Sequence, residues 1–107
     1  MLWLMLLLAL CWNLAEAREL KSVALRDSPT GTRAEIVLDS RAEYRLIPLS
    51  NPDRLVIDVL DTALAPQLRL PAGSGVVKSV RSGSPEAGVA RIVFDLAAPV
   101  VAIGPNL

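Results

Sequence analysis

The sequence predicts an all-β domain, a pseudo-symmetric β-sandwich built from two duplicated multi-stranded units. Three observations support this prediction. Two stretches of the chain repeat each other, apolar and polar residues alternate along the best-defined segments, and turn-forming residues separate these segments. Beyond the N-terminal segment, no stretch shows the apolar period of an amphipathic helix.

The repeat consists of three pairs of matching motifs at an offset of 56 to 57 residues. The first copy has Leu-Lys-Ser-Val at 20–23, Ser-Pro at 28–29 and Ile-Val-Leu-Asp at 36–39; the second has Val-Lys-Ser-Val at 77–80, Ser-Pro at 84–85 and Ile-Val-Phe-Asp at 92–95. A fixed period of this kind marks a duplicated structural unit. We therefore expect each copy to be a run of short strands that forms most of one sheet.

The second copy is shorter than the first. The first copy continues into a strand at residues 54–59, and the same offset places its equivalent near position ~110, beyond Leu107. We expect that this last strand is missing and that residues 18–107 are a truncated domain of a longer protein.

Three segments alternate with a period of two, which is typical of a half-buried strand. The residues predicted to point inward are Ala34, Ile36 and Leu38 in 33–39, Leu55, Ile57 and Val59 in 54–59, and Ile92, Phe94 and Leu96 in 91–96. Residues 61–70, interrupted by Pro66, are predicted to form an extended linker between the two units.

Three aspartates, Asp39, Asp58 and Asp95, follow apolar runs on the predicted solvent face of these strands. Paired carboxylates would allow a glycosidase-like hydrolase. The favoured interpretation is structural, because an Asp at a strand end keeps a sheet edge from aggregating.

The N-terminal 17 residues are predicted to be a signal peptide. Residues 1–12 are almost wholly apolar, and Ala15 and Ala17 place small residues at the −3 and −1 positions of a cleavage site before Arg18. Export from the cytoplasm is therefore expected.

Two alternatives to cleavage remain open. The apolar stretch is too short for a stable membrane span, which disfavours an anchor. Leu10, before Cys11, is bulky where lipid-attachment sites prefer a small residue. After cleavage the chain has no cysteine and can form no disulfide.

Composition excludes several classes of function. The net charge is zero, so no electrostatic footprint for nucleic acid is present. The absence of histidine excludes a Ser-His-Asp triad and the usual zinc sites. Gly73 and Gly75 lack the Lys and helix of a phosphate-binding loop. Tyr44 and Phe94 are the only aromatic residues after the signal peptide, which disfavours a sugar-stacking cleft. We expect no cofactor in this chain.

The arginines are the remaining candidates for ligand binding. Arg54 and Asp58, like Arg91 and Asp95, share a strand face four residues and about 13 Å apart, so they cannot pair within one strand. We expect them to pair across the sheet; the alternative is that their guanidinium groups bind carboxylate ligands. The candidate ligand-binding residues are Arg54, Arg81, Arg91, Arg45 and Tyr44.

Three motifs in a fixed order resemble the AMIN domain: Asn-Pro-Asp-Arg-Leu-Val-Ile-Asp at 51–58, Val-Lys-Ser-Val-Arg-Ser-Gly at 77–83 and Ala-Arg-Ile-Val-Phe-Asp-Leu at 90–96. The resemblance covers residues 20–107. It implies two similar four-stranded sheets packed as a sandwich. It also implies a non-catalytic module that follows an export signal and binds the cell wall.

From this resemblance we expect a peptidoglycan-binding, septal targeting module of a periplasmic N-acetylmuramoyl-L-alanine amidase, which cleaves peptidoglycan during cell separation. The expected partners are peptidoglycan, whose stem-peptide carboxylates the arginines would bind, and divisome proteins. Zinc and the catalytic glutamate would belong to a downstream domain. One alternative is the N-terminal module of a type IV pilus secretin. A free-standing enzyme is disfavoured because histidine is absent.

Overall fold

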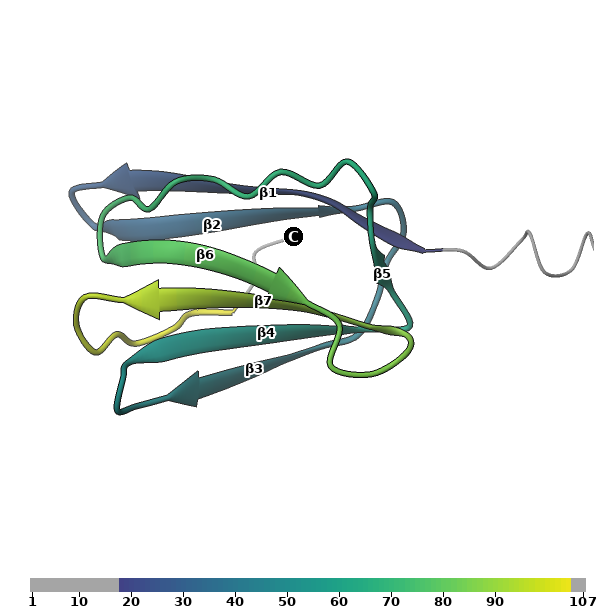
Figure 1. The fold of residues 1–107 in the computed structure, drawn as a ribbon. Coiled ribbons are helices and arrows are strands. Elements are labelled where there is room, and N and C mark those ends of the chain that lie inside the picture. The colour runs from purple at the N-terminus through teal and green to yellow at the C-terminus, as the bar shows by residue number, and fades with distance from the viewer. Residues whose placement is uncertain (1–17, 105–107) are drawn as a thin grey trace, which may run out of the picture.

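The computed structural model describes residues 18–104, which form two β-sheets and no helix (Figure 1). The strands are β1 (Glu19–Ser28), β2 (Gly31–Leu38), β3 (Tyr44–Leu49), β4 (Arg54–Leu60), β5 (Ala63–Leu64), β6 (Val77–Gly83) and β7 (Val89–Leu96). One sheet has the order β2-β1-β5 and the other the order β3-β4-β7-β6. The predicted all-β sandwich is confirmed.

The two copies of the repeat form two antiparallel hairpins, β1–β2 and β6–β7. Each hairpin has a register irregularity, of the kind that a β-bulge produces, at the matching lysine: Lys21 in β1 and Lys78 in β6. The turns differ, because Ser28 pairs with Gly31 across a two-residue turn whereas the connection between β6 and β7 is longer. The sequence repeat thus extends to a shared backbone irregularity.

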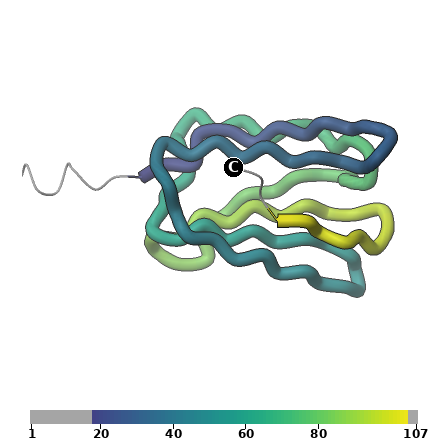
Figure 2. The backbone as a smooth tube through the Cα atoms, turned by 180° about the vertical axis from the view of Figure 1, so that it is seen from behind, coloured from purple at the N-terminus to yellow at the C-terminus, as the bar shows by residue number. Residues whose placement is uncertain are grey.

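The prediction that each copy forms most of one sheet is wrong. β1 and β2 lie in the three-stranded sheet, but β3 and β4, from the same copy, lie beside β7 in the four-stranded sheet. The chain crosses between the sheets through residues 39–43, and Figure 2 shows this crossing at one end of the molecule. The apolar strand β4 is paired along both edges, by β3 and β7, and so occupies the middle of the larger sheet.

The hydrophobic core lies between the sheets. Its buried members are Leu20 and Val23 from β1, Val59 from β4, Val77 from β6, and Ala90, Ile92 and Phe94 from β7. Most of the residues predicted to point inward either belong to this core or pack against it; the latter, partly buried, are Ile36, Leu38, Leu55, Ile57 and Leu96. Ala34 is exposed instead, near the turn that ends the first hairpin. Alternation therefore predicted the core-facing side of all three strands.

The segment between β4 and β6 is extended, as predicted, and contains only the short strand β5, which pairs in parallel with β1. Its last part contacts the first hairpin, where the Val76 backbone N–H donates a hydrogen bond to Thr32 Oγ1 at 3.2 Å. Gly75 has a φ of +57°, and a Cβ there would overlap Thr32 Oγ1 and the Asp27 carboxylate. Both the backbone conformation and the close approach therefore require glycine.

The predicted signal peptide, including Ala17 at its cleavage site, lies outside the described residues, and the next residue, Arg18, is exposed. Within residues 18–104 there is no helix with the length and apolar character needed to cross a membrane. The expectations on cleavage and on chain truncation stay predictions.

Candidate functional site

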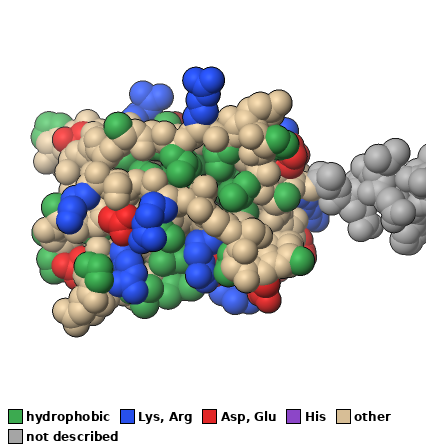
Figure 3. Space-filling model, in the orientation of Figure 1, with side chains coloured by type: hydrophobic (Ala, Val, Ile, Leu, Met, Phe, Trp, Pro, Cys, Tyr) green, Lys and Arg blue, Asp and Glu red, His purple; other side chains and the backbone are tan. Residues whose placement is uncertain are grey.

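The candidate site is the outer face of the four-stranded sheet, on the side away from the core. Residues that pair directly across strands project to the same side, so the register defines which side chains share this face. In the order β3, β4, β7 and β6, the rows are Arg45, Asp58, Arg91 and Gly83, then Ile47, Val56, Val93 and Arg81, then Leu49, Arg54, Asp95 and Ser79. Figure 3 shows Lys and Arg side chains gathered over this sheet with hydrophobic side chains between them. All four predicted arginines therefore share one face, which we call the arginine face.

Tyr44, the fifth predicted residue, does not belong to the arginine face. It pairs with Val59, a core residue, so its side chain lies on the opposite side of β3 from that of Arg45. Tyr44 is 46% exposed and lies beside Gly104, in the segment that follows β7. A ligand bound on the arginine face would not contact this ring.

In the first row, Arg91 and Asp58 form a bidentate ion pair. Arg91 donates from Nε to Asp58 Oδ1 at 2.7 Å and from Nη2 to Oδ2 at 2.9 Å. Asp58 lies on the predicted outer side of β4, but the expectation that it is exposed to solvent there is wrong, because it is only 5% exposed beside the Arg91 guanidinium. The hydrogen bonds from Arg91 lower the pKa of Asp58, and the nearby Arg45 lowers it further. Asp58 is therefore a buried anchor for Arg91.

A second bidentate pair joins the other two rows. Arg81 donates from Nε to Asp95 Oδ2 at 2.8 Å and from Nη2 to Oδ1 at 2.9 Å, and Ser79 Oγ donates to Oδ2 at 2.8 Å. These bonds, those from Arg81 above all, lower the pKa of Asp95 to about 2. Both oxygens of each aspartate on the face thus accept hydrogen bonds from within the sheet.

The other two arginines have no carboxylate partner among residues 18–104. Arg54 pairs by register with Asp95, but Arg81 bonds that carboxylate and Arg54 Nη1 donates instead to the Pro52 carbonyl oxygen at 2.7 Å. Arg45 is exposed and, like Arg54, forms no salt bridge with any residue in the described part of the chain. The expected cross-strand pairing is confirmed for Arg91 but not for Arg54. Two guanidinium groups on this face keep most of their donors available.

Sequence reasoning predicted that the arginines pair across the sheet, but it missed which arginine bonds Asp58 and which bonds Asp95. A signal for this was present, since β4 and β7 each carry Arg and Asp four residues apart, and antiparallel pairing of two such strands places each Arg opposite an Asp. Whether each opposed pair forms an ion pair then depends on neighbouring strands. Here Arg54 lies opposite Asp95, but Arg81 on β6 forms the hydrogen bonds with the Asp95 carboxylate.

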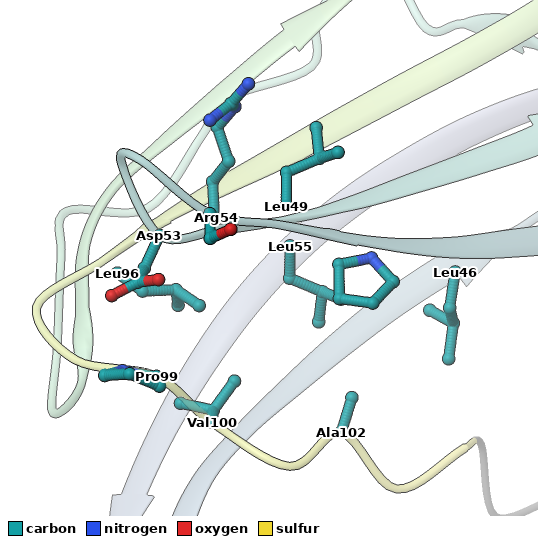
Figure 4. A pocket seen from close by; sticks show the side chains of 11 residues that line it. Leu46, Leu49, Asp53, Arg54, Leu55, Leu96, Pro99, Val100 and Ala102 are labelled. Atoms are coloured by element: carbon teal, nitrogen blue, oxygen red, sulfur yellow. The ribbon is translucent and has the colours of Figure 1, made fainter.

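An open groove of about 420 Å³ lies on the other side of β3 and β4, against the segment that follows β7. In Figure 4, Arg54 points to one side of β4 while Leu55 and Leu46 point to the other, toward Val100 and Ala102. The groove is lined mostly by apolar side chains, and Leu49 and Arg54 at the end of the arginine face also line it. No cluster of metal-ligating side chains occurs within residues 18–104.

These features define a small all-β module that presents charged hydrogen-bond donors on an open sheet face rather than in an enclosed cavity. The family model of the AMIN domain matches residues 22–103. The chain therefore belongs to the AMIN domain family, as its three motifs predicted. AMIN domains are targeting and binding modules of the cell envelope that occur in amidases and secretins. No curated protein matches the sequence.

Proposed function

We propose that this chain binds peptidoglycan in the periplasm and thereby brings an N-acetylmuramoyl-L-alanine amidase to the septum, where the amidase cleaves peptidoglycan during cell separation. Membership of the AMIN domain family supports a targeting role in the envelope. The structural observation that supports wall binding is the arginine face, where four arginines accompany two aspartates that are already hydrogen-bonded. Peptidoglycan offers the complementary anion, because its stem peptides carry carboxylates.

An open face of this kind suits an extended polymer better than a small molecule. Each exposed ion pair contributes little alone, about 0 to 1 kcal/mol. A repeating polymer offers the same group many times, so several weak contacts act together and rebinding is favoured. Binding through exposed guanidinium groups should weaken as salt rises, since such charges are screened over about 8 to 10 Å at physiological ionic strength.

The chain's contribution under this proposal is targeting. The zinc ion and catalytic carboxylate of the amidase would belong to a separate domain, and divisome proteins are further candidate partners. A type IV pilus secretin is the alternative parent, and it would use the same module on the same wall. The gene around this chain distinguishes the two: a zinc amidase domain supports the proposal, whereas a secretin barrel contradicts the choice of parent.

The direct test is co-sedimentation of the purified chain with isolated sacculi at low salt. We expect the chain to pellet with the sacculi, and we expect a negative charge on the arginine face, introduced as Arg45→Glu, to reduce the pelleted fraction. Arg33→Glu on the outer face of the three-stranded sheet is the matched control, because Arg33 is also an exposed strand residue. A wild-type chain that stays in the supernatant would refute wall binding.

A further inference from the structure

We propose that Arg45 and Arg54 form a two-point carboxylate site on the arginine face, and that this site recognises the stem peptide of peptidoglycan rather than its glycan strand. This inference rests on the proposed function and names the part of the wall that is bound. It assigns different roles to the four arginines, because two bind the ligand and two hold the sheet face in place.

The division of roles follows from the hydrogen bonds. Arg91 and Arg81 each use Nε and Nη2 on a carboxylate of their own sheet, which fixes both side chains. Arg45 lies near Asp58, but both Asp58 oxygens already accept bonds from Arg91. Arg54 donates one bond to a backbone carbonyl. The donor fork formed by Nε and one Nη, which matches a carboxylate geometrically, is therefore bonded in Arg81 and Arg91 and available in Arg45 and Arg54.

The two available arginines are spaced along the strands. Arg45 on β3 pairs with Asp58 on β4, four residues from Arg54 on the same strand. Four residues of β-strand span about 13 Å. An extended peptide covers this distance with about four residues. A short peptide lying along β3 and β4 can thus present one carboxylate to each arginine.

The surface between the two arginines is apolar. Ile47 and Val56 are paired midway between Arg45 and Arg54, and Val93 adjoins Val56 on the next strand. Val56 is only 5% exposed, so the accessible apolar surface of this strip comes from the half-buried Ile47 and Val93 on either side of it. Methyl and methylene groups of a peptide can lie over this strip while its carboxylates reach the charged ends.

A glycan strand does not fit the same face. Sugar rings in binding sites usually stack on exposed aromatic side chains, which cover the apolar ring face while polar groups bind the hydroxyls. In residues 18–104 the aromatic side chains are Tyr44, which lies on the other side of β3, and Phe94, which is 2% exposed in the core. The arginine face therefore matches the anionic peptide and not the neutral faces of the sugars.

The test compares three forms of the wall in the same sedimentation assay, using the complete purified chain. The first is intact sacculi, and the second is sacculi whose carboxylates have been converted to amides with a carbodiimide and ammonia. The third is glycan strands from which the stem peptides have been removed enzymatically and whose lactyl carboxylates, freed by that hydrolysis, have been converted to amides in the same way. We expect affinity for the second and third forms to fall at least about tenfold below that for the first.

Two charge-matched variants complete the test. The double variant Arg45→Gln and Arg54→Gln should bind intact sacculi as weakly as the wild-type chain binds the amidated form. The control, Arg33→Gln and Arg69→Gln, removes two exposed arginines outside the arginine face and should bind like the wild type. Thermal unfolding of each variant checks that the fold persists.

The outcomes separate this inference from the proposed function. Wild-type binding to peptide-free glycan that equals binding to intact sacculi overturns the peptide site but leaves wall binding intact. Wild-type failure on intact sacculi overturns the proposed function itself. If the double variant does not fold, the comparison of intact with amidated sacculi still tests the carboxylate site, because it uses the unmutated chain. Equal affinity for the two forms contradicts the carboxylate site.

Discussion

The ion pair between Arg91 and Asp58 gives the sharpest prediction about stability, because its two partners differ in exposure. The Asp58 side chain is 7% exposed and that of Arg91 is 36% exposed. Removing Arg91, as Arg91→Met, leaves a carboxylate within the sheet without its two charge-assisted hydrogen bonds. Breaking a fully buried pair in this way costs about 3 to 5 kcal/mol. Since Arg91 is partly hydrated and Arg45 lies nearby, we expect a loss of about 2 to 4 kcal/mol.

The complementary change, Asp58→Asn, should cost less. The amide keeps an acceptor oxygen for Arg91, and the guanidinium that loses its counter-charge can hydrate, so we expect about 1 to 2 kcal/mol. The double variant should be more stable than Arg91→Met alone, because it no longer contains a buried unpaired charge. Urea unfolding followed by circular dichroism at pH 7 measures all four proteins, and the double-mutant cycle isolates the coupling energy.

The pH dependence of the same cycle provides a second check. Hydrogen bonding to Arg91 lowers the pKa of Asp58 in the folded chain, so its stabilising contribution is present above the unfolded pKa of about 3.9 and is lost as pH falls through the folded pKa. The difference between the wild type and Arg91→Met should therefore shrink below about pH 4. Two results would refute this explanation of the ion pair. One is an equal loss of unfolding free energy in Arg91→Met and Asp58→Asn, and the other is a stability difference between the wild type and Arg91→Met that does not change with pH.

Three further predictions concern the rest of the domain. Asp95 has a folded pKa of about 2, below its ordinary value of 3.8, so the melting temperature should fall as pH drops from about 4 toward 2, and less in Asp95→Asn; an equal fall in both proteins would contradict this. Gly75→Ala should cost about 2 kcal/mol or more, whereas Gly83→Ala, where a Cβ meets nothing within 4 Å, should change stability by less than about 1 kcal/mol in the same unfolding assay. Phe94→Ala should cost about 3 to 5 kcal/mol and the partly buried Ile57→Ala less; the reverse order would mean that the core is centred elsewhere.

Local alternation predicted well which face of a strand each side chain lies on, but it predicted less well how exposed to solvent each side chain is. Ile92 and Phe94 were expected to point inward and are 0% and 2% exposed, because successive residues of a strand must project to opposite faces. Asp58 was correctly placed on the outer face yet is nearly buried. Its cover comes from Arg91, a long side chain on a neighbouring strand, and no periodicity within β4 can show that.

The sheet to which each strand belongs depends on pairing between distant residues, and the repeat alone did not show it. The repeat predicted two related runs of strands, and the structure shows that the matching motifs form hairpins with an irregularity at the matching lysine of each. The repeat did not show that β3 and β4, which belong to the first copy, lie in the same sheet as β7 from the second copy. That arrangement depends on the pairing of β4 with β7, which are distant in the sequence. The sequence singled out four arginines that share a face. It did not show which of them have carboxylate partners, because this too depends on which strands are neighbours.

The most direct test of the central claim is a titration of the isotope-labelled chain with soluble stem-peptide fragments that carry free carboxylates, followed by NMR. The prediction is that the largest shifts occur at the Nε–H groups of Arg45 and Arg54 and at the β3 and β4 amides between them, with no comparable shifts on β1 and β2. Largest shifts at Arg33 on the outer face of the three-stranded sheet, or at Val100 in the groove, would contradict it.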